Sequence, residues 1–210
     1  KLKDDVKAGK QPRMQPERAR RTHDELTARL EQRQAELNAI KNVVSSTPVV
    51  IGGALVIPQG LLSHRKGETQ FAVDADARAH VEKVAMDAVT NAELSFGFDV
   101  KDVAADKCGW DITSRPTANP DGSIKPDRHI EVKGRSKGQT TITVSRNEII
   151  YGLNQSEKFI LAIVIVDGNT FEGPYYVKKP FTQEPDFGVA SINYDLSDLL
   201  SKAVAPEKTI

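Results

Sequence analysis

The feature that most constrains the fold is an uninterrupted apolar run at residues 159–166. The run has the length of one strand, and an apolar residue at every position predicts a strand buried on both faces. Such a strand lies inside a sheet that other elements cover on either side. It is also the longest apolar stretch of the chain and falls far short of the ~20 residues that span a bilayer, so no membrane segment is expected.

The residues around this run alternate between helical and extended periodicity. The expected elements are, in order, a helix at 76–96, a short extended piece at 100–103, strands at 108–114, 128–133 and 140–144, a helix at 145–153, the strand at 159–166, an edge strand at 175–178 and a helix at 194–203. Together these predicted helices and strands form one domain at 75–205. The order helix, strand, strand, strand, helix, strand predicts an α/β fold with a mixed sheet.

The residues before this domain have a different composition. Residues 17–44 contain no proline or glycine, and their apolar residues recur at helical spacing, which predicts a long amphipathic helix within an extension at 1–46. We expect its apolar stripe to pack on this domain, on a missing upstream domain or on a partner helix. Residues 47–74 are expected to hold a short strand segment, split by Gly52 and Gly53, and a linker. The chain begins without a methionine, so we interpret it as part of a longer protein.

Charge and cysteine content exclude some classes of site. The 210 residues include 29 basic and 29 acidic side chains, so bulk charge gives no support for nucleic-acid binding. The single cysteine, Cys108, excludes an intramolecular disulfide and a multi-cysteine zinc site, and it suits a cytoplasmic location. The P-loop pattern is absent from both glycine-rich stretches, 52–53 and 134–140, so no ATPase site is predicted.

Strand alternation brings three chemically useful residues together. Trp110 and Ile112 are expected on one face of their strand and Asp111 on the other, whereas Glu131 and Lys133 alternate away from their apolar neighbours. If the two apolar faces look into the core, Asp111, Glu131 and Lys133 converge on the outer surface of a hairpin. Paired carboxylates suit Mg²⁺ or Mn²⁺, which polarises a phosphate and activates water. The ammonium of Lys133 would orient that water or neutralise developing charge.

The pattern of Asp111 followed by Glu131, Val132 and Lys133 resembles the signature of the PD-(D/E)xK nuclease superfamily. The element order resembles its restriction-endonuclease-like α-β-β-β-α-β core. A closer resemblance is to the NO VEIN carboxy-terminal-like domain, a domain of unknown function that often ends Swi/Snf-type helicases of bacteria. The stretches that carry it are VEKVAM at 81–86, CGWDI at 108–112, IEVKG at 130–134, TVSRNE at 143–148 and EPDFG at 184–188.

The resemblance implies roles for individual residues. Asp111 and Glu131 would be the metal ligands and Lys133 the catalytic lysine. The superfamily often adds a glutamate from the first helix, and Glu82 stands where we expect it, with Glu93 as the rival. The two are eleven residues apart, about 16 Å along a helix, so only one reaches the metal. The upstream partner would be a helicase or ATPase domain of the same parent chain, and defence against foreign DNA is a natural setting.

Other polar residues surround this predicted centre. Arg135 and Lys137 flank the site, and Arg146 and Asn147 lie at a helix start where backbone N–H groups favour phosphate, so these four are the predicted DNA contacts. Glu148 completes a capping box with Ser145 and is interpreted as a capping residue rather than a catalytic one. His129 is expected at the rim of the site.

Three hypotheses of function follow from these patterns. The first is a Mg²⁺- or Mn²⁺-dependent DNA nuclease domain at the carboxy-terminal end of a helicase-like protein. The second is a module that retains the fold and holds DNA without cutting it. The third is a structural appendage that residues 17–44 dock to the helicase. The complete set of Asp111, Glu131 and Lys133 favours the first, and the neutral net charge favours the third.

Overall fold

The computed structural model describes residues 16–44, 47–57, 61–62, 65, 75–106, 108–118 and 125–206. The chain divides into two compact units, Gln15–Phe71 and a larger unit formed mainly by Ala72–Ile210. In the first unit, helix α2 (Pro16–Ile40) confirms the long helix expected from the spacing of its leucines. Its stripe is exposed within that unit, as Leu30 and Ile40, each 58% exposed, illustrate.

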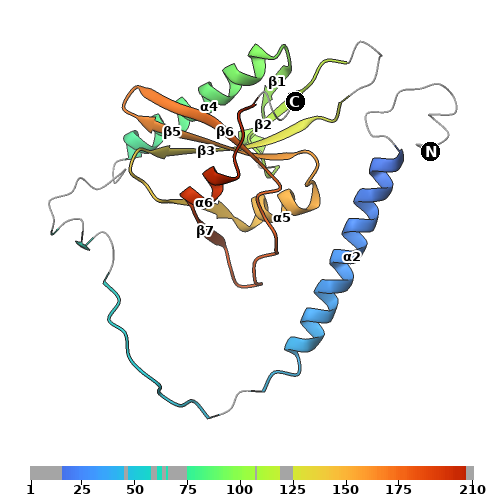
Figure 1. The fold of residues 1–210 in the computed structure, drawn as a ribbon, viewed down its shortest axis with the longest axis vertical. Coiled ribbons are helices and arrows are strands. Elements are labelled where there is room, and N and C mark those ends of the chain that lie inside the picture. The colour runs from blue at the N-terminus through green and yellow to red at the C-terminus, as the bar shows by residue number, and fades with distance from the viewer. Residues whose placement is uncertain are drawn as a thin grey trace. The chain divides into compact units, whose positions relative to one another are not determined.

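The second unit is a mixed α/β domain, as predicted. Its elements are α4 (Ala75–Ser95), β1 (Asp99–Asp102), the 3₁₀ turn η1 (Ala104–Asp106), β2 (Ile112–Arg115), β3 (Arg128–Ser136), β4 (Thr141–Ser145), α5 (Arg146–Asn154), β5 (Phe159–Asp167), β6 (Thr170–Lys178), β7 (Ser191–Asp195) and α6 (Leu196–Ser201). Five strands form one sheet in the order β1-β2-β3-β5-β6, and β4 pairs with β7 in a second sheet (Figure 1). Among the strands of the described residues, β3 and β5 run parallel and the other neighbouring pairs are antiparallel.

Both faces of the five-stranded sheet are covered. Helix α4 lies on one face, and α5, α6 and β7 lie on the other (Figure 1). Alternate residues of β5 enter two different cores: Ile160 and Ala162 pack on the α4 side, whereas Leu161 and Ile163 pack with residues of β4, α5 and α6. The apolar run at 159–166 therefore forms the doubly buried strand that its composition predicted.

Local sequence signals fix the end of α4 and the start of α5. Gly97 follows α4 with φ +75°, a left-handed conformation that glycine adopts without steric cost, which confirms the predicted end of that helix. Ser145 caps α5: its side chain accepts from the N–H of Glu148, and the Glu148 side chain accepts from the N–H of Ser145. The predicted capping box is therefore present, and it anchors α5 directly to the end of β4.

Strand β4 does not belong to the five-stranded sheet. Residues 141–145 form a strand, but β4 pairs with β7 in the small sheet, and the short piece at Asp99–Asp102 joins the large sheet as β1. The reason is that β3 already has β2 on one side and β5 on the other, so no edge of β3 is left for β4. The expected strand at 108–114 also begins later, at Ile112, after a bend in which Gly109 has φ +99°.

Two other predictions are corrected. Residues 47–57, expected as a strand segment, have no regular structure, because no described strand offers them hydrogen-bonding partners, and Ile51 is 98% exposed. The expected helix at 194–203 divides into the end of β7 and the shorter helix α6, because residues 191–195 pair with β4. Residues 66–74, at the end of the segment expected to hold a linker, lie outside the described residues.

Candidate active site

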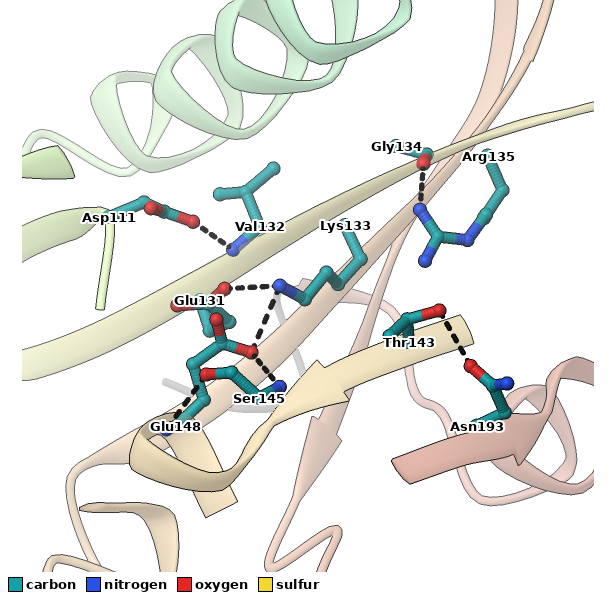
Figure 2. A network of polar contacts seen from close by, with 10 residues as sticks. All are labelled: Asp111, Glu131, Val132, Lys133, Gly134, Arg135, Thr143, Ser145, Glu148 and Asn193. Atoms are coloured by element: carbon teal, nitrogen blue, oxygen red, sulfur yellow. Dashed lines mark hydrogen bonds and ion pairs between the residues drawn. The ribbon is translucent and has the colours of Figure 1, made fainter. Parts of the chain in front are cut away.

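Strands β2 and β3 bring the predicted acidic residues and lysine to one face of the sheet. Ile112 and Ile130 pack on the α4 side, so their neighbours Asp111 and Glu131 project to the opposite face. The N–H of Val132 donates to Oδ2 of Asp111 at 2.8 Å, which fixes the Asp111 carboxylate beside β3 (Figure 2). Lys133 follows Glu131 by two residues and shares its face. The structure thus brings Asp111, Glu131 and Lys133 together, as the alternation predicts.

Lys133 is the centre of this cluster. Its Nζ donates to Oε1 of Glu131 at 2.6 Å and lies 3.0 Å from Oε2 of Glu148 (Figure 2). The three side chains are largely buried, with 5% of Glu131, 15% of Lys133 and 18% of Glu148 exposed. A third carboxylate, from α5, therefore reaches the lysine that β3 presents.

The charges in this cluster perturb one another strongly. Burial raises the pKa of Glu131 to about 8; Lys133 opposes the shift, and the carboxylates of Asp111 and Glu148 add to it. Burial likewise raises the pKa of Asp111. Although burial disfavours the ammonium, the carboxylates of Glu131 and Glu148 raise the pKa of Lys133. Lys133 is therefore a cation at neutral pH.

The site is less open than the predicted hairpin surface. Glu131 was expected on an outer face, but the layer of β4, α5 and α6 covers that face, and the whole residue is only 4% exposed. The sequence pattern could not show this, because the covering elements come later in the chain. Asp111, which is part-buried at the entry to β2, is the more open of the two predicted metal ligands.

Trp110 does not share the face of Ile112, because it follows the bend at Gly109, where φ is +99°, and strand β2 begins only at Ile112. Its indole stacks on His129 with centroids 4.3 Å apart and on Tyr151 with centroids 4.5 Å apart, and its Nε1 donates to Thr113. His129 also hydrogen-bonds the Tyr151 hydroxyl. Burial lowers the pKa of His129 to about 4, so this ring is neutral above mildly acidic pH and belongs to an aromatic cluster beside Asp111.

The two candidate helix glutamates have other partners. Glu82 is exposed on α4, and its charge acts on Arg135. Glu93 is fully buried and pairs with Arg128, with Nε–Oε2 and Nη2–Oε1 distances of 2.9 and 3.0 Å. The helix carboxylate that reaches Lys133 is Glu148. The sequence signal for Glu148 was the capping box. It predicts the contact of the Glu148 carboxylate with Ser145 but not its contact with Lys133.

The four residues predicted to contact DNA differ in their exposure and in their contacts with the rest of the protein. Arg135 donates to the carbonyl oxygens of Thr141 and Gly134, and the exposed Lys137 pairs with Asp167 at 2.9 Å. Arg146 donates to the carbonyls of Asp186 and Phe187 and lies over the Phe187 ring. Asn147 is exposed at the first turn of α5. Arg135 lies on β3 and Lys137 in the turn that follows it, whereas Arg146 and Asn147 begin α5.

The donor set fits a magnesium-type ion with a low number of protein ligands. Within the described residues, no three His, Cys, Asp or Glu side chains are arranged to hold a metal. Asp111 Oδ1 and Glu131 Oε2 nevertheless receive no hydrogen bond from the described residues, so each carboxylate keeps one oxygen that could coordinate a cation. Mg²⁺ commonly takes one or two carboxylates and completes its shell with water and phosphate oxygens.

The raised pKa of Glu131 predicts a pH-dependent cost to stability in EDTA. A carboxyl whose pKa is higher in the folded than in the unfolded state stabilises fully below about pH 4.5, and this contribution is lost as pH rises to about 8. Glu131→Gln removes that titration, so the free energy of unfolding of the variant relative to wild type is expected to rise by a few kcal/mol from pH 4.5 to 8.5. Urea unfolding at both pH values measures it, and parallel profiles would contradict the assignment.

Residues 81–177 match the family described as protein NO VEIN, C-terminal, which confirms the predicted resemblance. The matched segment contains Asp111, Glu131, Lys133 and Glu148 and ends before the EPDFG stretch at 184–188. No curated protein and no solved structure matches the chain. Among the described residues, no helix is long and apolar enough to cross a membrane.

Proposed function

Taking the match of residues 81–177 to the NO VEIN C-terminal family as the premise, we propose that this domain is a metal-dependent nuclease that hydrolyses phosphodiester bonds in DNA. The observation that carries the proposal is the buried ammonium of Lys133, which lies between the carboxylates of Glu131 and Glu148. A third carboxylate, that of Asp111, lies at the more exposed side of the same cluster. This set of groups resembles the signature of the PD-(D/E)xK nucleases, in which two carboxylates and one lysine act on a phosphate, and that resemblance supports the proposal.

Each residue of the cluster has a distinct role in this proposal. Asp111 and Glu131 would hold Mg²⁺ or Mn²⁺, which when bound polarises a phosphate and lowers the pKa of water. Asp111 keeps its orientation through the N–H of Val132. Lys133 donates hydrogen bonds to the phosphate oxygen or the attacking water and stabilises the negative charge that develops. Its raised pKa makes it a donor and not a general base at neutral pH.

The domain would act within a longer protein. The exposed stripe of α2 offers an apolar surface to an upstream helicase or ATPase domain of the same parent chain, which would deliver the nuclease domain to DNA. Arg135, Lys137, Arg146 and Asn147 are the proposed contacts to the DNA backbone, and Lys137 and Asn147 are the most exposed of them. Phosphate contacts of this kind position the strand without reading its sequence.

One observation favours a second function. Lys133 already has two carboxylate partners, so the cluster is complete as a buried ion-pair network without metal or DNA. A network of that kind suits a module that keeps the fold and binds DNA, or docks on the helicase, without cutting.

Glu82 is exposed on α4, and its charge acts on Arg135. We propose it as an auxiliary group for the nuclease function and give it no role in the non-cutting module.

Cleavage of a supercoiled plasmid and of a single-stranded oligonucleotide tests the proposal. The 210-residue chain is incubated with Mg²⁺, with Mn²⁺ or with EDTA, and a mock preparation from cells that lack the gene controls for contaminating nucleases. We expect nicked or linear product with metal and none with EDTA or in the mock preparation. Absence of cleavage under every condition, together with retained DNA binding in a gel-shift assay, would support the non-cutting module instead.

A further inference from the structure

We propose that Glu148 is a positioning residue that holds the Lys133 ammonium in place for the reaction; this inference rests on the proposed nuclease function. One oxygen of Glu148, Oε2, receives two donors: Nζ of Lys133 and the backbone N–H of Ser145, each at 3.0 Å. Figure 2 shows that the Glu148 carboxylate approaches Lys133 from α5, opposite the strand that carries the lysine. Lys133 is thus held from two layers of the domain.

The capping box makes Glu148 a rigid support. Its own N–H donates to Oγ of Ser145 at 3.3 Å, so both its backbone and its carboxylate are tied to the same residue. Ser145 is in turn the last residue of β4 and pairs with Ser191 of β7. A lysine side chain has four flexible bonds, so a fixed acceptor outside its own strand is what selects one position of Nζ.

Glu131 alone does not provide that support. It lies two residues from Lys133 on the same strand, and it is also one of the two residues that would hold the metal. A cation bound by Glu131 competes with Lys133 for the same carboxylate, whereas Glu148 is not among the proposed ligands. The contact at 3.0 Å between Glu148 and Lys133 therefore keeps the ammonium beside the phosphate when Glu131 is engaged elsewhere.

Three variants distinguish the positioning of Lys133 by Glu148 from the capping of helix α5. Glu148→Gln keeps an oxygen that accepts from both Lys133 and Ser145, and glutamine also completes a capping box. Glu148→Leu is of similar size and loses the acceptor. Ser145→Ala removes the serine half of the capping box and leaves the Glu148 carboxylate facing Lys133. Only the leucine variant is expected to release the lysine.

The first readout is the acetylation rate of Lys133 by sulfosuccinimidyl acetate, measured by mass spectrometry on the metal-free chain without DNA. We expect a rate about tenfold higher in Glu148→Leu than in wild type, and rates close to wild type in Glu148→Gln and Ser145→Ala. The exposed Lys83, on α4, serves as an internal reference whose rate stays the same in every variant. Equal Lys133 rates in Glu148→Leu and wild type would overturn the proposal.

The second readout is steady-state cleavage of DNA. Glu148→Leu is expected to lower kcat by about 10- to 100-fold with little change in KM, whereas Glu148→Gln recovers most of the rate. A loss of kcat in Ser145→Ala as large as that in Glu148→Leu would overturn positioning and assign the effect to helix stability. If the wild type cuts no DNA while Glu148→Leu still frees Lys133 toward acetylation, the proposed function fails and the positioning contact stands.

Discussion

Asp111→Asn and Lys133→Met are both expected to lower metal-dependent cleavage by at least about 100- to 1,000-fold, but with opposite effects on metal affinity. Asparagine still accepts from the N–H of Val132 and loses the charge that would hold a cation, so Asp111→Asn binds Mn²⁺ more weakly. Methionine keeps most of the lysine stem and removes the ammonium that competes for Glu131, so Lys133→Met binds Mn²⁺ more tightly. Calorimetric titration measures the affinities, and plasmid cleavage measures the rates.

A matched control distinguishes the site from general charge effects. Asp87 is an exposed aspartate on α4 that pairs with Lys83 at 2.6 Å, so Asp87→Asn removes the same charge outside the cluster. It is expected to leave both Mn²⁺ affinity and cleavage at the wild-type level. If Lys133→Met cleaves as fast as wild type, the lysine takes no part in the reaction. If Asp111→Asn binds Mn²⁺ as tightly as wild type, Asp111 is not a ligand.

The alternation of residues along β3 predicted which face carries Glu131 and Lys133, whereas the alternation at residues 110–112 misplaced Trp110. Ile130 and Val132 belong to one face of β3 and Glu131 and Lys133 to the other because side chains alternate along any strand, whatever the tertiary structure. The doubly buried β5 was predictable for a similar reason, since an unbroken apolar run has few other stable environments. These features depend on residues that are close in sequence.

The features that the sequence did not reveal depend on contacts between distant segments. The pairing of β4 with β7 joins residues about fifty positions apart, and the sequence of residues 141–145 does not indicate which strand they pair with. For the same reason, the burial of Glu131 and the approach of Glu148 to Lys133 were missed, because they follow from how α5 packs on the sheet. The capping box located Glu148 on its own helix, and only the tertiary structure placed it at the site.

Glu93→Ala is expected to destabilise the domain by about 3–5 kcal/mol, a large part of the usual stability of a domain. Glu93 is fully buried, forms two hydrogen bonds with Arg128 and accepts from the Tyr176 hydroxyl at 2.6 Å. The Arg128 guanidinium also lies over the rings of Phe98 and Tyr176. Loss of the carboxylate leaves a guanidinium charge buried between α4 and the sheet without its main counter-charge.

Urea unfolding at pH 7 measures the effect, with two variants that bracket it. Tyr176→Phe removes one hydrogen bond to the carboxylate and leaves the ion pair, so its cost is expected to be about 1.5–3 kcal/mol. The double variant Glu93→Leu with Arg128→Met replaces both charges by apolar side chains, and it is expected to recover much of the stability lost in Glu93→Ala. If Glu93→Ala unfolds at the wild-type urea concentration, the pair does not hold α4 to β3.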